Sequence, residues 1–230
     1  MITLGLDTAT SACAVALWDA ASGRTLAVRA ETMQRGLAEK LVPMVQATLA
    51  DAGIGFADLS RIGVTVGPGT FTGLRVGLAA ARGFALAAGC PLVGVTTLEA
   101  AAHGLDHAAR IGRTVLAAIE SRRDDLFLQP FAADLSPLGE PADVLPPDLP
   151  AYAAAHLPAG PLLIVGDAAA RAGAALGAWE SGMTMVETTG AAEAVATARM
   201  AATQDVAGIA ARIADPFYLR PPDVTLPKQG

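Results

Sequence analysis

Apolar residues in the first half of the chain form short runs that alternate with stretches of helical spacing. Short apolar runs bounded by Gly, Pro, Ser or Asp predict strands. Apolar side chains that recur every three to four residues, as they do from Leu37 to Leu49, predict an amphipathic helix. The strands predicted in this half cover residues 2–6, 12–18, 24–31, 62–66 and 92–95, and the helices cover residues 36–52, 72–88 and 97–107.

The second half repeats the beginning of this pattern in a shorter form. Strands are predicted at residues 114–120, 125–132, 162–165 and 183–186, and helices at 167–177 and 191–214, with a proline-rich loop between 135 and 161. The order βββαβαβα of the first half is that of a ribonuclease-H-like lobe. We therefore expect an α/β protein with the duplicated fold of the actin-like ATPases: two lobes with mixed sheets, the second lobe reduced. The predicted lobes span residues 1–108 and 109–211, and a tail of about residues 212–230 is expected to pack back on the first lobe.

The segment Val66–Gly89, with the sequence VGPGTFTGLRVGLAAARGFALAAG, contains the chain's densest motif. Its Gly-Pro-Gly turn ends a strand and precedes a helix that contains Gly73, Gly77 and Gly83. Each glycine inside a helix costs about 1 kcal/mol relative to alanine. Close packing or a partner is therefore expected at these positions.

Several motifs of the chain resemble the TsaB (YeaZ) family. The match is dense over residues 1–125, thin over 126–205, and returns near the C-terminus. The motifs that carry it are GPGTFTGLRVGLAAARG from Gly67, the opening ITLGLDTAT from Ile2 with the strand ACAVAL from Ala12, GVTTLE from Gly94, AAIESRR from Ala117 and PFYLR from Pro216.

This resemblance implies a function in the modification of tRNA. Members of the family work with TsaD and TsaE in making threonylcarbamoyladenosine (t6A37). The chain is then expected to be a non-catalytic scaffold subunit that binds and activates TsaD, allows TsaE to join, forms a homodimer by itself, and meets tRNA only through the complex.

The resemblance places the partner surface on the two helices predicted at 36–52 and 72–88. Each helix needs one apolar face to cover its own sheet, so a partner requires a second one. Arg75 and Arg82 are the only charged residues between Phe71 and Gly89, which favours such a second face. The residues expected at the interface are Leu37, Leu41, Met44, Val45, Thr48, Gly73, Arg75, Val76, Gly77, Ala80, Arg82 and Phe84.

The sequence contains residues that match only part of a nucleotide site of the actin-like type. The turn at Asp7, Thr8 and Thr10 lies where such ATPases hold phosphate and metal, and Gly166 and Asp167 lie where a glycine pair is expected. These residues are interpreted either as a vestigial nucleotide site or as turn residues that bond their own backbone. No cofactor is predicted, and a nucleotide held at a subunit interface stays open. The alternative function is an ATP-dependent phosphotransferase or metal-dependent hydrolase that uses Asp7 and Asp167.

A metal site is not predicted. The family of TsaD carries a metal-binding pair of histidines, and Thr97 and Ala101 occupy those positions here. Neither side chain replaces an imidazole as a ligand. His103 and His107 are four residues apart, but two histidines alone rarely make a site.

Composition excludes several classes of function. The net charge of −6 and the pI near 5.0 argue against a protein that grips an RNA backbone alone. No apolar run long enough to cross a membrane and no secretory signal are present. Cys13 and Cys90 are too few for a disulfide framework, which favours a cytoplasmic protein. The roles of Arg122 and Arg123 stay open, either between the lobes or at an interface.

Overall fold

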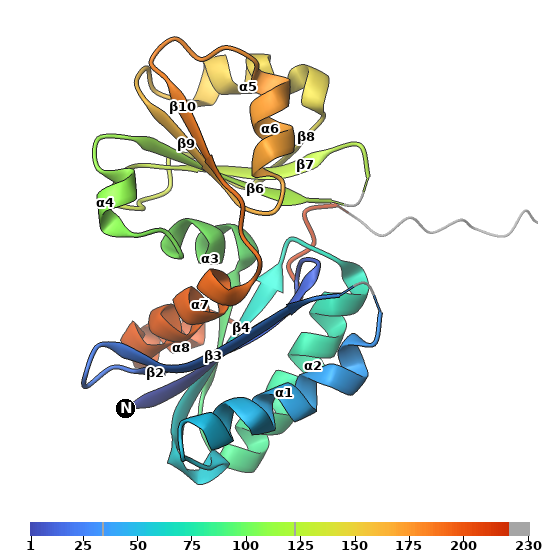
Figure 1. Ribbon diagram of the computed structural model, residues 1–230, viewed down its shortest axis with the longest axis vertical. Helices are drawn as coiled ribbons and strands as arrows, with labels where there is room; N and C mark the ends of the chain where they lie inside the picture. The colour runs from blue at the N-terminus through green and yellow to red at the C-terminus, as the bar shows by residue number, and fades with distance from the viewer. Residues whose placement is uncertain (34, 122, 221–230) are drawn as a thin grey trace, which may run out of the picture.

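The computed structural model describes residues 1–33, 35–121 and 123–220. Within these residues the chain forms two lobes, and each lobe is built on a five-stranded mixed sheet (Figure 1). Arg122 and residues 221–230, which the sequence analysis singled out or assigned to the tail, lie outside the described residues.

The first lobe contains the longest helices of the described chain. In its sheet, the antiparallel hairpin of the first three strands continues into two parallel strands. The apolar faces of the two helices that precede and follow the fourth strand cover one side of the sheet. Its elements are β1 (Ile2–Asp7), β2 (Ala12–Asp19), β3 (Arg24–Thr32), α1 (Leu37–Asp51), η1 (Phe56–Asp58), β4 (Leu59–Gly67), α2 (Phe71–Ala88), β5 (Leu92–Thr96) and α3 (Thr97–His103), followed by the short α4 (His107–Arg110).

The second lobe has the same order of elements, and most of its strands and its first two helices are shorter. Three antiparallel strands are again followed by two parallel ones. Its elements are β6 (Thr114–Glu120), β7 (Leu126–Phe131), β8 (Ala142–Val144), η2 (Pro146–Asp148), α5 (Leu149–His156), β9 (Leu162–Val165), α6 (Ala169–Leu176), β10 (Met183–Val186), α7 (Ala191–Thr203) and α8 (Val206–Ala211).

The two sheets have the same topology. The first has the strand order β3-β2-β1-β4-β5, and the second, read in the same direction, has β8-β7-β6-β9-β10. The predicted duplication with a reduced second lobe is therefore confirmed at the level of topology. The predicted helix 191–214 is wrong in length, because the chain leaves the helix at Gln204 and Asp205 caps a separate α8 through the N–H of Gly208.

One helix from each half of the chain packs on the sheet of the other half. The α7 helix lies on β1, β2 and β4 of the first sheet, and α3 lies against β6 and β7 of the second (Figure 1). The two helices also contact each other between the lobes. The predicted boundary is corrected here: residues 191–203 belong with the first sheet, although the prediction placed them in the second lobe.

Glycines in the first sheet allow α7 to approach very closely. A Cβ atom on Gly5 would lie 2.2 Å from the carbonyl oxygen of Ala194, and one on Gly63 would lie 2.7 Å from that of Thr197. Neither position has room for a side chain. The close approach brings Ala194 into contact with the alanines of β2 in a separate small core.

The described part of the C-terminal tail contacts the first lobe. The N–H of Phe217 donates to the carbonyl of Val66 at 2.7 Å, and the carbonyl of Arg212 accepts from Gly94 at 2.9 Å. The last described residue, Arg220, pairs with Asp125 and Asp143 of the second lobe. This part of the tail therefore ties the lobes together. Among the described residues, no helix has the combined length and apolar character that crossing a bilayer requires.

Candidate functional site

The predicted apolar stripe of α1 faces the core of its own lobe. Leu41, Met44, Val45 and Thr48 are all buried against the first sheet, and only Leu37 remains half-buried. The hydroxyl of Thr48 donates to the carbonyl of Met44. For these four residues the prediction of a partner surface is wrong, because covering the sheet already uses the stripe.

Contacts within the first lobe explain two of the three glycines of α2. A Cβ on Gly73 would lie 2.0 Å from the carbonyl oxygen of Thr8, and one on Gly77 would lie 2.1 Å from the Thr8 hydroxyl. The Thr8 hydroxyl donates to the carbonyl of Gly73 at 2.9 Å. Gly73 and Gly77 therefore bring α2 close to the β1–β2 turn and are not available to a partner, which corrects the prediction.

The side of α2 that faces away from the sheet is exposed, and it carries apolar side chains together with Arg75 and Arg82. Phe71, Ala79 and Leu86 lie on it, and Val42 of α1 is exposed beside the helix pair. Leu86 is 86% exposed, which is unusual for a large apolar side chain. The α2 helix therefore exposes apolar side chains in addition to those that cover its sheet, but they are not the residues that the sequence indicated.

The other predicted interface residues lie at the edge of this face or are held by their own chain. Val76, Ala80 and Phe84 are half-buried, and the ring of Phe84 packs on Phe56 with centroids 5.4 Å apart. Arg82 donates to Ala214 and Asp215 of the tail. Arg75 is exposed, and its guanidinium lies over Phe71. The sequence analysis missed Phe71 and Leu86, although both lie inside the motif that it singled out.

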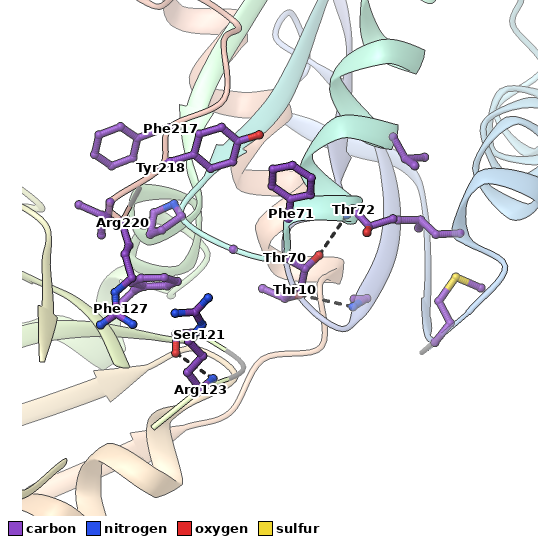
Figure 2. A pocket seen from close by; sticks show the side chains of 18 of the residues that line it. Thr10, Thr70, Phe71, Thr72, Ser121, Arg123, Phe127, Phe217, Tyr218 and Arg220 are labelled. Carbon is purple, nitrogen blue, oxygen red and sulfur yellow. Dashed lines mark hydrogen bonds between the residues drawn. The ribbon is translucent and has the colours of Figure 1, made fainter. Parts of the chain in front are cut away.

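A groove opens at the N-terminal end of α2, where the two lobes meet (Figure 2). It encloses about 630 Å³. Phe71 and Thr72 of α2 lie on one side, Tyr218 of the tail forms the rim, and Ser121 and Arg123 of the β6–β7 turn face them from the second lobe. Arg123, whose role the sequence analysis left open, thus lines a groove between the lobes.

The residues of the proposed vestigial nucleotide site are largely sealed. Asp7 and Thr8 have no exposed surface, and Gly166 is buried as well, with its φ of +129° and no space for a Cβ beside Ala118. Thr10 alone of these residues lines the groove. Asp167 is half-buried and accepts from the N–H of Glu120 at 2.9 Å.

Asp7 is bonded on one side only. Its Oδ1 accepts from the hydroxyl of Thr65 at 2.7 Å and from the N–H of Ala9 at 3.1 Å. Its Oδ2 has no hydrogen-bond partner among the described residues. The first two contacts agree with the interpretation of Asp7 as a turn residue. A nucleotide would reach this carboxyl only after the lobe had opened.

Three carboxyl groups gather where β1, α7 and the β9–α6 turn meet. Burial, with Glu193 nearby, raises the pKa of Asp7 to about 7. Burial likewise raises the pKa of Asp167 to about 6, and it raises the pKa of Glu193. Glu193 was not predicted, because it lies on α7 and is far from Asp7 in the sequence. Burial thus disfavours the charged form of all three acids.

The described residues contain no group of three or more His, Cys, Asp or Glu side chains that could hold a metal ion. Thr97 and Ala101 are buried in α3, where the resemblance led us to look for histidines. His103 is partly buried, which lowers its pKa, and His107 is exposed at the start of α4.

Comparisons with known proteins bear on the family. The family model described as TsaD, tRNA N6-adenosine threonylcarbamoyltransferase, matches residues 27–215. The tRNA threonylcarbamoyladenosine biosynthesis protein TsaB of Escherichia coli K12 is 37% identical over 134 residues, 58% of this chain and 56% of that protein. An uncharacterized protein of Mycobacterium tuberculosis, Rv3421c, is 34% identical over 165 residues, 72% of this chain and 71% of that protein. The alignment thus spans little more than half the length of the Escherichia coli relative.

Solved structures agree over a longer range. YeaZ from Pseudomonas aeruginosa superposes with a TM-score of 0.77 at 28% identity, over 95% of this chain and 99% of that one. A ROK hexokinase from Thermus thermophilus gives a TM-score of 0.54 at 15% identity, over 88% of this chain and 99% of that one, and shows the shared actin-like fold alone. Together with the topology of the two sheets, these matches show that the chain belongs to the TsaB (YeaZ) family.

Proposed function

We propose that the chain is a non-catalytic scaffold subunit in the biosynthesis of threonylcarbamoyladenosine on tRNA. In this proposal it binds and activates TsaD, allows TsaE to join, and contacts tRNA only within the complex. The names of its relatives support the pathway. The observation that carries the scaffold function is the exposed apolar side of α2, with Phe71, Ala79 and Leu86.

The chemistry of the cleft supports the same proposal. Asp7 is fully buried and bonded to its own lobe, so it offers no carboxylate to a substrate in this conformation. A phosphotransferase or hydrolase that uses Asp7 and Asp167 therefore has no observation in its favour. A helix with a large exposed apolar side, by contrast, is typical of a protein-protein interface.

The test introduces a charge on α2. Ala79→Arg places a long cation on the exposed apolar face, and we expect TsaD to be lost from co-purification because an unpaired buried charge costs several kcal/mol. Ala79 is exposed in the free chain, so the fold should persist. The matched control is Ala170→Arg on α6, an exposed helical alanine of the second lobe. TsaD that co-purifies equally with both variants would contradict the proposal, and the same experiment with tagged and untagged copies tests the homodimer.

A further inference from the structure

The rim of the groove carries a cluster of two aromatic rings and one arginine, defined by Phe71, Arg75 and Tyr218. The rings of Phe71 and Tyr218 stack with centroids 5.7 Å apart. The guanidinium carbon of Arg75 lies 3.7 Å from the centre of the Phe71 ring, and its Nε lies 3.5 Å from the Tyr218 hydroxyl. Phe71 and Tyr218 remain 47% and 39% exposed. The three side chains are therefore held in place relative to one another and still reach solvent.

Exposed aromatic rings beside an arginine are typical of the anchor positions of protein interfaces. Their energetic advantage depends on a fixed geometry, because ordered side chains lose less entropy on binding. Here the stacking fixes that geometry before any partner arrives. Phe71 comes from α2 and Tyr218 from the tail, so the cluster exists only while the tail stays on the first lobe.

The charges around the groove differ in sign from the chain as a whole. Arg35 lines the groove, and Arg75 contacts Phe71 and Tyr218, which line it; neither arginine has a carboxylate partner among the described residues. Asp125 is buried and paired with Arg220. Glu39 is the other acidic residue that lines the groove. The local balance is positive in a chain whose net charge is −6.

We propose that this groove binds an extended acidic segment of a partner protein. A carboxylate of the segment pairs with Arg75 and Arg35, and an apolar or aromatic side chain packs on Phe71 and Tyr218. The volume of about 630 Å³ lies within the range of pockets that bury a ligand of several residues' size. Nucleic acid is disfavoured as the occupant, because its backbone carries a negative charge at every nucleotide, and the acidic chain repels it more strongly than a segment with few carboxylates. The inference rests on the proposed function only in that the partner is sought within the same complex.

The experiment measures binding of peptides to the intact chain. Overlapping fluorescent peptides of about 12 residues that cover TsaD and TsaE of the same cell are titrated by fluorescence anisotropy. We expect at least one acidic peptide to bind, with an affinity that falls as salt is raised. Arg75→Ala and Tyr218→Ala should each weaken it about tenfold or more. The matched control Arg24→Ala removes an exposed arginine of β3, far from the groove, and should bind as the unchanged chain does.

Two results would overturn the inference. One is that no peptide binds, or that Arg75→Ala and Tyr218→Ala bind peptide as tightly as Arg24→Ala does. The other is that a single-stranded RNA of similar length binds more tightly than any peptide and responds to the same variants. Ala79→Arg separates this inference from the proposed function, since it should abolish co-purification with TsaD and leave peptide binding intact. If the unchanged chain co-purifies with TsaD but binds no peptide, the proposal for the groove is refuted and the proposed function is not.

Discussion

The two lobes share one topology but cover their sheets with helices of very different length. In the first lobe α1 and α2 have 15 and 18 residues, whereas the equivalent α5 and α6 of the second lobe have 8 each. Val42, Phe71 and Leu86 are large apolar side chains exposed on α1 and α2, and α5 and α6, both fully described, expose none. Helices longer than their own sheet requires leave apolar surface uncovered. The first lobe is therefore the one suited to a partner.

The two helices that pack on the opposite sheet, α3 and α7, also differ in how closely they approach it. On the second sheet α3 packs over side chains such as Ala117 and Leu163, whereas α7 lies directly on Gly5 and Gly63 of the first sheet. The closer approach of α7 excludes solvent from Asp7 and places Glu193 beside it. In the first lobe, close packing of α7 on two glycines of the sheet thus keeps Asp7 away from solvent.

The largest expected effect comes from filling this contact. Gly5→Val adds a side chain where even a Cβ would lie 2.2 Å from the backbone of α7, so the helix must move. We expect a loss of at least about 4 kcal/mol in the free energy of unfolding, measured by urea denaturation. The control in the second lobe is Gly139→Ala, whose Cβ would meet Pro130 at an ordinary 3.5 Å. If the two variants lose similar free energies of unfolding, the contact between Gly5 and α7 is no tighter than the contact between Gly139 and Pro130.

The second effect tests the sealed carboxyl group by its pH dependence. The pKa of Asp7 is raised by burial from 3.8 to about 7, so the folded state holds a proton that the unfolded state releases. The resulting stability is complete below about pH 4 and is lost as the pH rises through about 7. Asp7→Asn removes this dependence. At pH 8 the variant should be more stable than the unchanged chain, by up to about 4 kcal/mol, and the advantage should vanish near pH 4.

Stability curves at several pH values check this expectation. Asp167, Glu193 and Cys13 are the other titratable groups that interact with Asp7, so the comparison uses the difference between variant and unchanged chain rather than either curve alone. Thr65→Val serves as a control, because it removes the hydroxyl that bonds Asp7 and keeps the carboxyl group. A constant difference between pH 4 and pH 8 would mean that folding does not raise the pKa of Asp7.

Local sequence pattern predicted the strands, the order of elements and the duplication, because each strand and helix is specified by its own apolar spacing. It did not predict which face of α1 or α2 stays uncovered. The helical spacing of Leu41 and Met44 is the same whether these side chains pack on their own sheet or on a partner. The packing of α7 on the first sheet could not be predicted either. Gly5 and Gly63 lie in that sheet, and the residues of α7 that they contact lie about 130 residues later or more. Contacts distant in sequence leave no periodic signal.

The smallest effect concerns a glycine that the monomer does not explain. Gly83 lies inside α2, is exposed, and has no atom within 4 Å of the position of an added Cβ. Gly83→Ala should therefore raise stability by about 1 kcal/mol, a rise in Tm of about 2–4 °C for a chain of this size. Gly73→Ala, which would meet the carbonyl of Thr8, is the control and should lower the Tm. If Gly83→Ala raises the Tm and weakens association with TsaD, the glycine serves close approach of a partner to the exposed side of α2. If association is unchanged, the contact does not extend to this turn of the helix, and the partner surface is confined to its N-terminal half.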